Sequence, residues 1–190
     1  MTTGSRRDFL KAGGLVLAGA GIAPLFRSRL LALPAPKLIE MRSDALGSRV
    51  WFDPIGLFVQ PGTTVRWILR ENVHTTTAYH PKNDQHSLRI PDGAAPWDSG
   101  FLVKPGATFD VTLTVPGVYD YYCMPHEAAG MVGRIVVGKG TGPGSQPFDY
   151  WVGKPGTDGW RRVPDAARAA FPSVERILAE RVVHPIGGIR

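Results

Sequence analysis

Residues 123–131 carry the side chains of this chain that are best suited to binding a metal. Cys123, His126 and Met131 have the spacing Cys-x2-His-x4-Met and lie in a turn between two strand-like segments. A thiolate, an imidazole and a weakly bound thioether suit a blue-copper electron-transfer centre, provided that a second imidazole completes the set. The spacing therefore predicts a copper site with one ligand from elsewhere in the chain.

His74 is the best candidate for the second imidazole, since it follows the end of an alternating strand. His80 and His86 compete with it, but both lie in a polar stretch that predicts an exposed loop. Met124 is a rival thioether. Because it directly follows Cys123, we expect it to point away from the metal and to serve in packing.

The elements that must position these residues are short strands between positions 37 and 138. Segments 63–69 and 107–115 each follow a Pro-Gly pair and alternate apolar with polar residues, and segments 118–122 and 133–137 enclose the metal-binding turn. Period-2 alternation between turns at this spacing favours an all-β fold, an antiparallel β-sandwich. We expect one such domain over residues 37–138.

The N-terminal residues 1–35 indicate an export signal. The pair Arg6-Arg7 precedes Phe9-Leu10, and a small-residue apolar run follows at 12–25. This order is typical of a twin-arginine signal; the alternative is a basic amphipathic helix. We expect a periplasmic or otherwise exported protein. The cleavage site is left open, and an uncleaved N-terminus would tether the protein to the membrane.

Export bears on the cysteine. Cys123 is the only cysteine in 190 residues and has no disulfide partner in the chain. A lone cysteine is more often a small buried apolar side chain than a ligand. An unpaired thiol is nevertheless unusual in an exported protein, and metal ligation would account for it.

The net charge of +6 does not indicate a nucleic-acid partner. Residues 1–35 contribute +4, which leaves 17 basic against 15 acidic residues in the remainder. So small an excess gives no basis for nucleic-acid binding.

Residues 139–190 form a C-terminal extension of different composition. A Gly-rich stretch at 138–145 predicts a flexible linker. Two short helices are expected after it, one from Asp165 to before Pro172 and one capped by Ser173 and running to Val183. We expect this extension to pack against the domain or to be partly disordered; docking of a redox partner is the alternative.

Residues 40–138 resemble the type 1 copper proteins, the cupredoxins, and especially the plastocyanin, pseudoazurin and halocyanin groups. The most specific matches are 117–123 and 125–133. The resemblance implies a Greek-key sandwich that binds one copper ion through His74, Cys123, His126 and Met131. It also implies that Asn72 forms a hydrogen bond within the site and holds the two ligand segments together.

The resemblance further implies a monomeric, non-enzymatic carrier of single electrons between exported redox partner proteins, with the ring edge of His126 as the electron port. Two alternatives stay open. One is a copper-binding module for metal delivery, which would need exposed Met and His clusters. The other is an accessory domain of a copper oxidase or nitrite reductase-like enzyme, which would need further histidines. Only His80, His86 and His184 are left, without a His-x-His pair.

Overall fold

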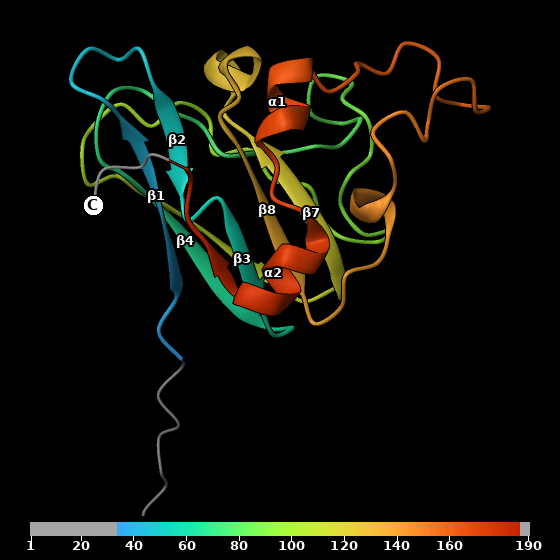
Figure 1. Ribbon diagram of the computed structural model, residues 1–190, viewed down its shortest axis with the longest axis horizontal. Helices are drawn as coiled ribbons and strands as arrows, with labels where there is room; N and C mark the ends of the chain where they lie inside the picture. The colour runs from blue at the N-terminus through green and yellow to red at the C-terminus, as the bar shows by residue number, and fades with distance from the viewer. Residues whose placement is uncertain (1–33, 187–190) are drawn as a thin grey trace, which may run out of the picture. The chain divides into compact units, whose positions relative to one another are not determined.

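The computed structural model describes residues 34–186, and these form two facing β-sheets (Figure 1). The first sheet has the strand order β2 (Val50–Asp53), β1 (Lys37–Ser43), β4 (Thr63–Leu69) and β6 (Thr108–Leu113). The second has the order β5 (Thr77–Ala78), β7 (Gly117–Tyr122), β8 (Val132–Val137), β3 (Gly56–Val59) and β9 (Val182–Val183). No helix of the described part has the length and apolar character needed to cross a membrane.

The expected β-sandwich is confirmed, but its sheets are mixed rather than purely antiparallel. β1 pairs with β4 in parallel, and β3 pairs with β8 in parallel. The reason is the route of the chain, which leaves the first sheet after β2, adds β3 to the second sheet and returns as β4. A chain that crosses between sheets in this way can return in the same direction as an earlier strand.

The core lies between the sheets and is rich in aromatic side chains. Along β4 the buried positions alternate, so Trp67 faces inward, and its ring centroid lies 5.2 Å from that of Tyr121 on β7. Gly133 on β8 is the cross-strand partner of Tyr121. A Cβ atom at Gly133 would lie only 2.2 Å from the Tyr121 hydroxyl oxygen. Glycine is therefore needed here so that the tyrosine ring can lie over the strand.

The C-terminal extension packs as part of the same compact unit as the sandwich. Helices α1 (Asp165–Ala170) and α2 (Val174–Glu180) occur where they were expected, and the Ser173 hydroxyl caps α2 by accepting a hydrogen bond from the Arg176 amide. α2 ends at Glu180 rather than Val183, because the next residues form β9 and pair with β3.

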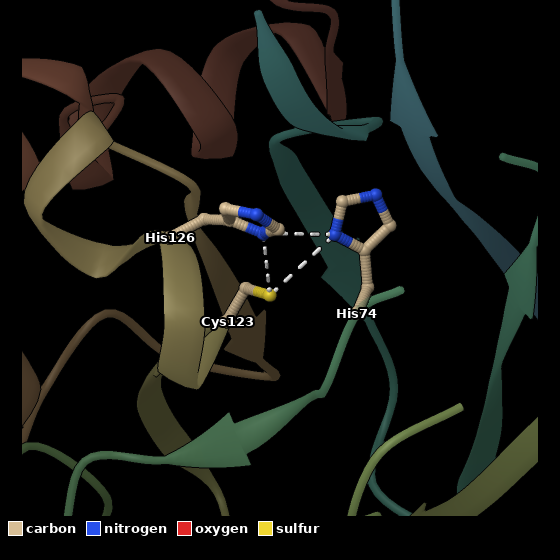
Figure 2. A group of neighbouring side chains, drawn as sticks. All are labelled: His74, Cys123 and His126. Atoms are coloured by element: carbon tan, nitrogen blue, oxygen red, sulfur yellow. Dashed lines mark hydrogen bonds between the residues drawn. The ribbon is translucent and has the colours of Figure 1, made fainter. Parts of the chain in front are cut away.

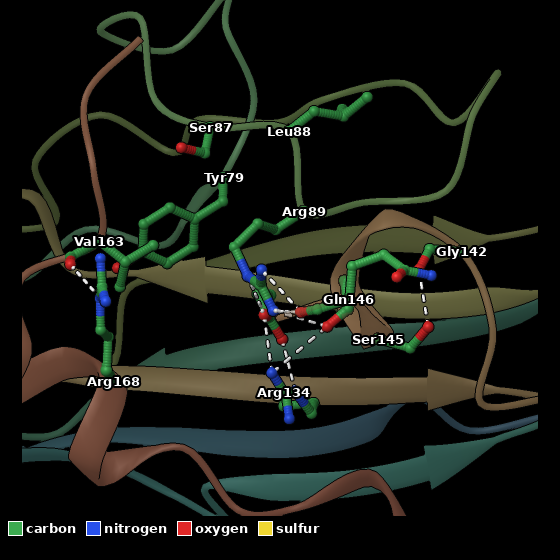
Figure 3. Close-up of polar contacts among 12 residues, drawn as sticks. Tyr79, Ser87, Leu88, Arg89, Arg134, Gly142, Ser145, Gln146, Val163 and Arg168 are labelled. Carbon is green, nitrogen blue, oxygen red and sulfur yellow. Dashed lines mark hydrogen bonds and ion pairs between the residues drawn. The ribbon is translucent and has the colours of Figure 1, made fainter. Parts of the chain in front are cut away.

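The prediction of a flexible linker at 138–145 is wrong. Pro143 and Gly144 are buried in the short 3-10 helix η2 (Pro143–Ser145). The Gly144 carbonyl accepts a hydrogen bond from Arg89 Nη2 at 2.7 Å. The Gln146 carbonyl accepts from the same nitrogen at 3.3 Å (Figure 3). Arg89 and Arg134 both bind the buried carboxylate of Asp120 on β7. This buried ionic network fastens the extension to the second sheet.

The prediction of an exposed loop around His80 and His86 is also wrong in part. His86, Arg89 and Ile90 are buried. The backbone explains this, because the Arg89 amide donates to the Tyr79 carbonyl and the Arg89 carbonyl accepts from the Asp120 amide. Segment 86–90 therefore runs beside β7 as an irregular edge.

Candidate metal centre

Three candidate ligands from two parts of the chain meet at one point. His74, Cys123 and His126 each offer one ligand atom, and these atoms lie within 4.8 Å of one another. Cys123 Sγ is 3.6 Å from Nδ1 of His74 and 3.4 Å from Nδ1 of His126 (Figure 2). The two Nδ1 atoms are 3.1 Å apart. The sulfur and both nitrogens thus converge on one small volume.

The ring of His74 is fixed by a hydrogen bond at Nε2, the nitrogen that does not face the cysteine. Its Nε2 lies 3.1 Å from the hydroxyl of Ser43 at the end of β1. If Nε2 carries the proton and donates it to this hydroxyl, Nδ1 keeps a free lone pair directed at the cysteine. A partner that fixes the tautomer of a histidine in this way is typical of metal-ligating histidines.

Backbone hydrogen bonds close the loop that carries the other candidates. The Cys123 amide donates to the Met131 carbonyl, the His126 amide donates to the Cys123 carbonyl, and the Met131 amide donates to the His126 carbonyl. The 3-10 helix η1 (Met124–Ala129) lies between them and ends at Gly130, which has a left-handed φ of 83°. Met131 is completely buried, and its backbone is fixed directly to the two other loop residues.

Thr75 joins the two ligand segments, and sequence reasoning missed it. Its amide lies 3.3 Å from Cys123 Sγ, and its hydroxyl accepts a hydrogen bond from the Met124 amide at 2.8 Å. The expected role of Asn72 is corrected, because Asn72 is exposed and its side-chain oxygen accepts from the neighbouring Val73 amide. Adjacency to His74 was the only sequence signal for Thr75, and it cannot reveal a contact with residue 123.

Burial disfavours charge on these groups in the metal-free protein. Desolvation, followed by the proximity of His126, lowers the pKa of His74 to about 4. Desolvation also lowers the pKa of His126. It raises the pKa of the Cys123 thiol to about 11, although hydrogen bonds from Thr75 act in the opposite direction. Neutral imidazoles are ready to bind a metal, whereas the thiol must first lose its proton.

The competing residues lie elsewhere. His80 Nδ1 accepts a hydrogen bond from the Lys82 amide, and His86 Nε2 contacts Glu127. Neither belongs to the group of converging ligand atoms found in the described chain. Met124 is 40% exposed and belongs to none of the hydrophobic clusters of the described chain, so the expected role in packing is not supported.

The donor set fits copper. One sulfur and two imidazole nitrogens converge, and a buried thioether lies in the same closed loop. Soft sulfur donors combined with imidazoles are the ligands of blue-copper sites, in which a methionine binds weakly along the axis.

Comparison with known proteins agrees with this chemistry. The family described as "Copper binding proteins, plastocyanin/azurin family" matches residues 39–138. A chloroplastic plastocyanin of Hordeum vulgare is 62% identical over an alignment of 138 residues, and the match covers 67% of this chain and 71% of the relative. A plastocyanin of Prochlorothrix hollandica is 34% identical over 137 residues, covering 69% and 93%. A solved pseudoazurin from Sinorhizobium is 28% identical with a TM-score of 0.50, covering 76% and 94%.

The fold and the site define a cupredoxin. The chain belongs to the plastocyanin/azurin family of copper-binding proteins. It is a blue copper electron-transfer protein, and copper is its cofactor. The resemblance to cupredoxins is thereby confirmed, and neither metal delivery nor an accessory role in a copper enzyme is favoured by its relatives.

Proposed function

We propose that one copper ion per chain is bound by His74, Cys123, His126 and Met131. The observation that carries this assignment is the convergence of the two Nδ1 atoms and the cysteine Sγ within 4.8 Å. The burial of Met131 and its backbone bonds to both loop residues support it as the thioether that would complete the set. The metal supplies one-electron redox chemistry, and the protein supplies a fixed ligand arrangement.

We infer that the protein is a carrier rather than an enzyme. The proposed set of four protein ligands leaves no open position for a substrate, unlike the set at a catalytic metal site. Rigid ligands favour rapid electron transfer, because little has to rearrange when the charge changes. The contact of Ser43 with His74, the closed loop and the Thr75 bridge all serve this rigidity.

The electron port in this proposal is the ring edge of His126. His74 and Cys123 are completely buried, whereas His126 is only partly buried and belongs to η1 at the surface. A donor or acceptor protein can therefore approach the site most closely at this ring. The proposal includes export through the twin-arginine signal at residues 1–35, of which 1–33 lie outside the described residues. It also includes exchange of electrons with exported partner proteins as a monomer.

The copper-loaded protein and a Cys123→Ser variant test the proposal. The wild-type protein should show the intense visible band and the EPR signature of a blue copper site, with reversible one-electron redox. The variant should lose the band, because a hydroxyl cannot supply thiolate-to-copper charge transfer. If the variant keeps the colour, Cys123 is not the ligand; if the wild-type protein turns over substrate at the metal, the carrier role is wrong.

A further inference from the structure

A buried carboxylate lies directly beside a proposed copper ligand. Glu127 follows His126 in η1 and is only 6% exposed. A carboxylate is rarely buried so completely unless other groups pair with it. Partner groups for the Glu127 carboxylate are therefore expected within the protein.

Both oxygens of this carboxylate have partners from the segment that precedes β6. The Tyr79 hydroxyl donates to Oε1 at 2.7 Å, and His86 Nε2 lies 2.9 Å from Oε2. Tyr79 and His86 are themselves buried. Burial and the neighbouring Glu127 raise the pKa of Tyr79 well above its usual value, so this phenol remains a donor.

The same cluster reaches the other side of the ligand loop. The ring of His86 is stacked on Tyr122, with centroids 4.4 Å apart and an interplanar angle of 7°. Tyr122 is the residue before Cys123, and Glu127 is the residue after His126. His86 therefore contacts the neighbours of two proposed ligands at once. Helix α1 lies against the end of the loop, where a Cβ atom at Gly130 would be 3.2 Å from the Ala166 carbonyl oxygen.

We propose that Glu127 is a positioning residue of the copper centre: Tyr79 and His86 hold its carboxylate, which anchors the ligand loop and places negative charge beside His126. This proposal rests on the copper site described above and adds a group outside the ligand set. Negative charge stabilises the more positive metal ion, so the carboxylate lowers the reduction potential. Anchoring to segment 79–86 also ties the geometry of the loop to a part of the chain that binds no metal.

Glu127→Gln separates charge from shape. The amide oxygen can still accept from Tyr79, and the amide nitrogen can donate to Nε2 of His86. His86 Nδ1 lies 3.2 Å from the Asp84 carbonyl, so a ring that accepts at Nε2 keeps a partner for a proton on Nδ1. The variant should therefore fold and bind copper with an almost unchanged visible spectrum, while the negative charge is lost.

The reduction potential is the decisive measurement. Glu127→Gln should shift the equilibrium toward the reduced ion by about three- to tenfold, the size expected for one nearby screened charge, tenfold being 59 mV for a one-electron couple. Glu180→Gln is the matched control, because Glu180 is exposed in α2 and paired with Arg176. α2 lies at the opposite end of the sandwich from α1 (Figure 1), so no shift is expected.

Tyr79→Phe tests the anchor, since it removes one hydrogen bond and keeps the charge. The Gly130 amide, which donates to the Glu127 carbonyl, should exchange its proton faster in the copper-free variant, and the potential should not rise. An unchanged potential in Glu127→Gln, an equal shift in Glu180→Gln, or a rise in Tyr79→Phe overturns the proposal. Each comparison uses variant protein that shows the same blue band as the wild type. Absence of this band from the wild-type protein would refute the copper site itself.

Discussion

Burial prepares the two kinds of ligand in opposite ways. The histidines are already neutral near pH 7, because desolvation lowers the pKa of His74 to about 4 and also lowers that of His126. Cys123 is a protonated thiol under the same conditions, since burial raises its pKa to about 11. Metal binding must therefore displace a proton from sulfur but not from the imidazoles.

Copper binding at pH 7 should accordingly release about one proton per site. The sign follows from the pKa values. At pH 7 the pH is far below the pKa of the thiol, so the thiol is protonated. The same pH is above the pKa values of both histidines, so their rings are neutral. Calorimetric titration in two buffers of different ionisation enthalpy measures the number released. A binding enthalpy that is independent of the buffer would contradict the protonated state of Cys123.

Met131→Leu should retain copper and raise the reduction potential, because the loss of a weak axial donor favours the reduced ion. Met124→Leu is the matched control, since Met124 is 40% exposed and Met131 is completely buried. Voltammetry of both variants measures the effect. Equal potentials for wild type and Met131→Leu would remove Met131 from the ligand set.

Among the elements, the C-terminal extension is the largest addition to the sandwich. Val163 and Ala167 pack over Tyr79 and Tyr122, which would otherwise lie on the outer face of the second sheet. The carbonyls of Gly144 and Gln146 bind Arg89, and the carbonyl of Pro172 binds Arg134. The extension therefore stabilises the strand that leads into Cys123.

Arg89→Met should lower the free energy of unfolding by about 3–5 kcal/mol, because it breaks a buried ion pair and leaves carbonyls of the extension without their donor. Arg66→Met removes an exposed pair with Asp110, which solvent screens, so the loss of stability should be much smaller. Urea denaturation of the two variants compares these losses. Similar losses for both would show that the buried network does not hold the extension.

Sequence patterns predicted those parts of the fold whose determinants are local. Alternation placed β4, and Ser173 marked the start of α2. The ligand loop was recognisable because three donors lie within nine residues. The burial of His86 and η2 was not predictable, since it depends on partners that are distant in sequence: Glu127 binds His86, and Arg89 binds the Gly144 carbonyl of η2. The bridge between the two ligand segments was assigned to Asn72, whereas Thr75 provides it. Two polar residues that both lie close to His74 in sequence cannot be distinguished without their side-chain directions.

At the scale of the whole molecule, the charge of the chain is concentrated at its beginning. Residues 1–35 carry a net charge of +4, and the rest of the chain is nearly balanced. This division is expected if the basic segment is an export signal and the remainder is the functional protein. The proposed export therefore depends on the pair Arg6-Arg7 rather than on the copper-binding unit.

Replacing Arg6 and Arg7 together by lysine should retain the precursor inside the cell. The substitution keeps both positive charges, so a purely electrostatic role would survive it. A guanidinium presents a planar fork of donors that an ammonium cannot reproduce, and twin-arginine signals depend on the arginine pair. Fractionation of expressing cells measures the exported share, and Lys11→Arg, which also preserves charge, is the control. Undiminished export of the double-lysine form would show that another route carries the protein out.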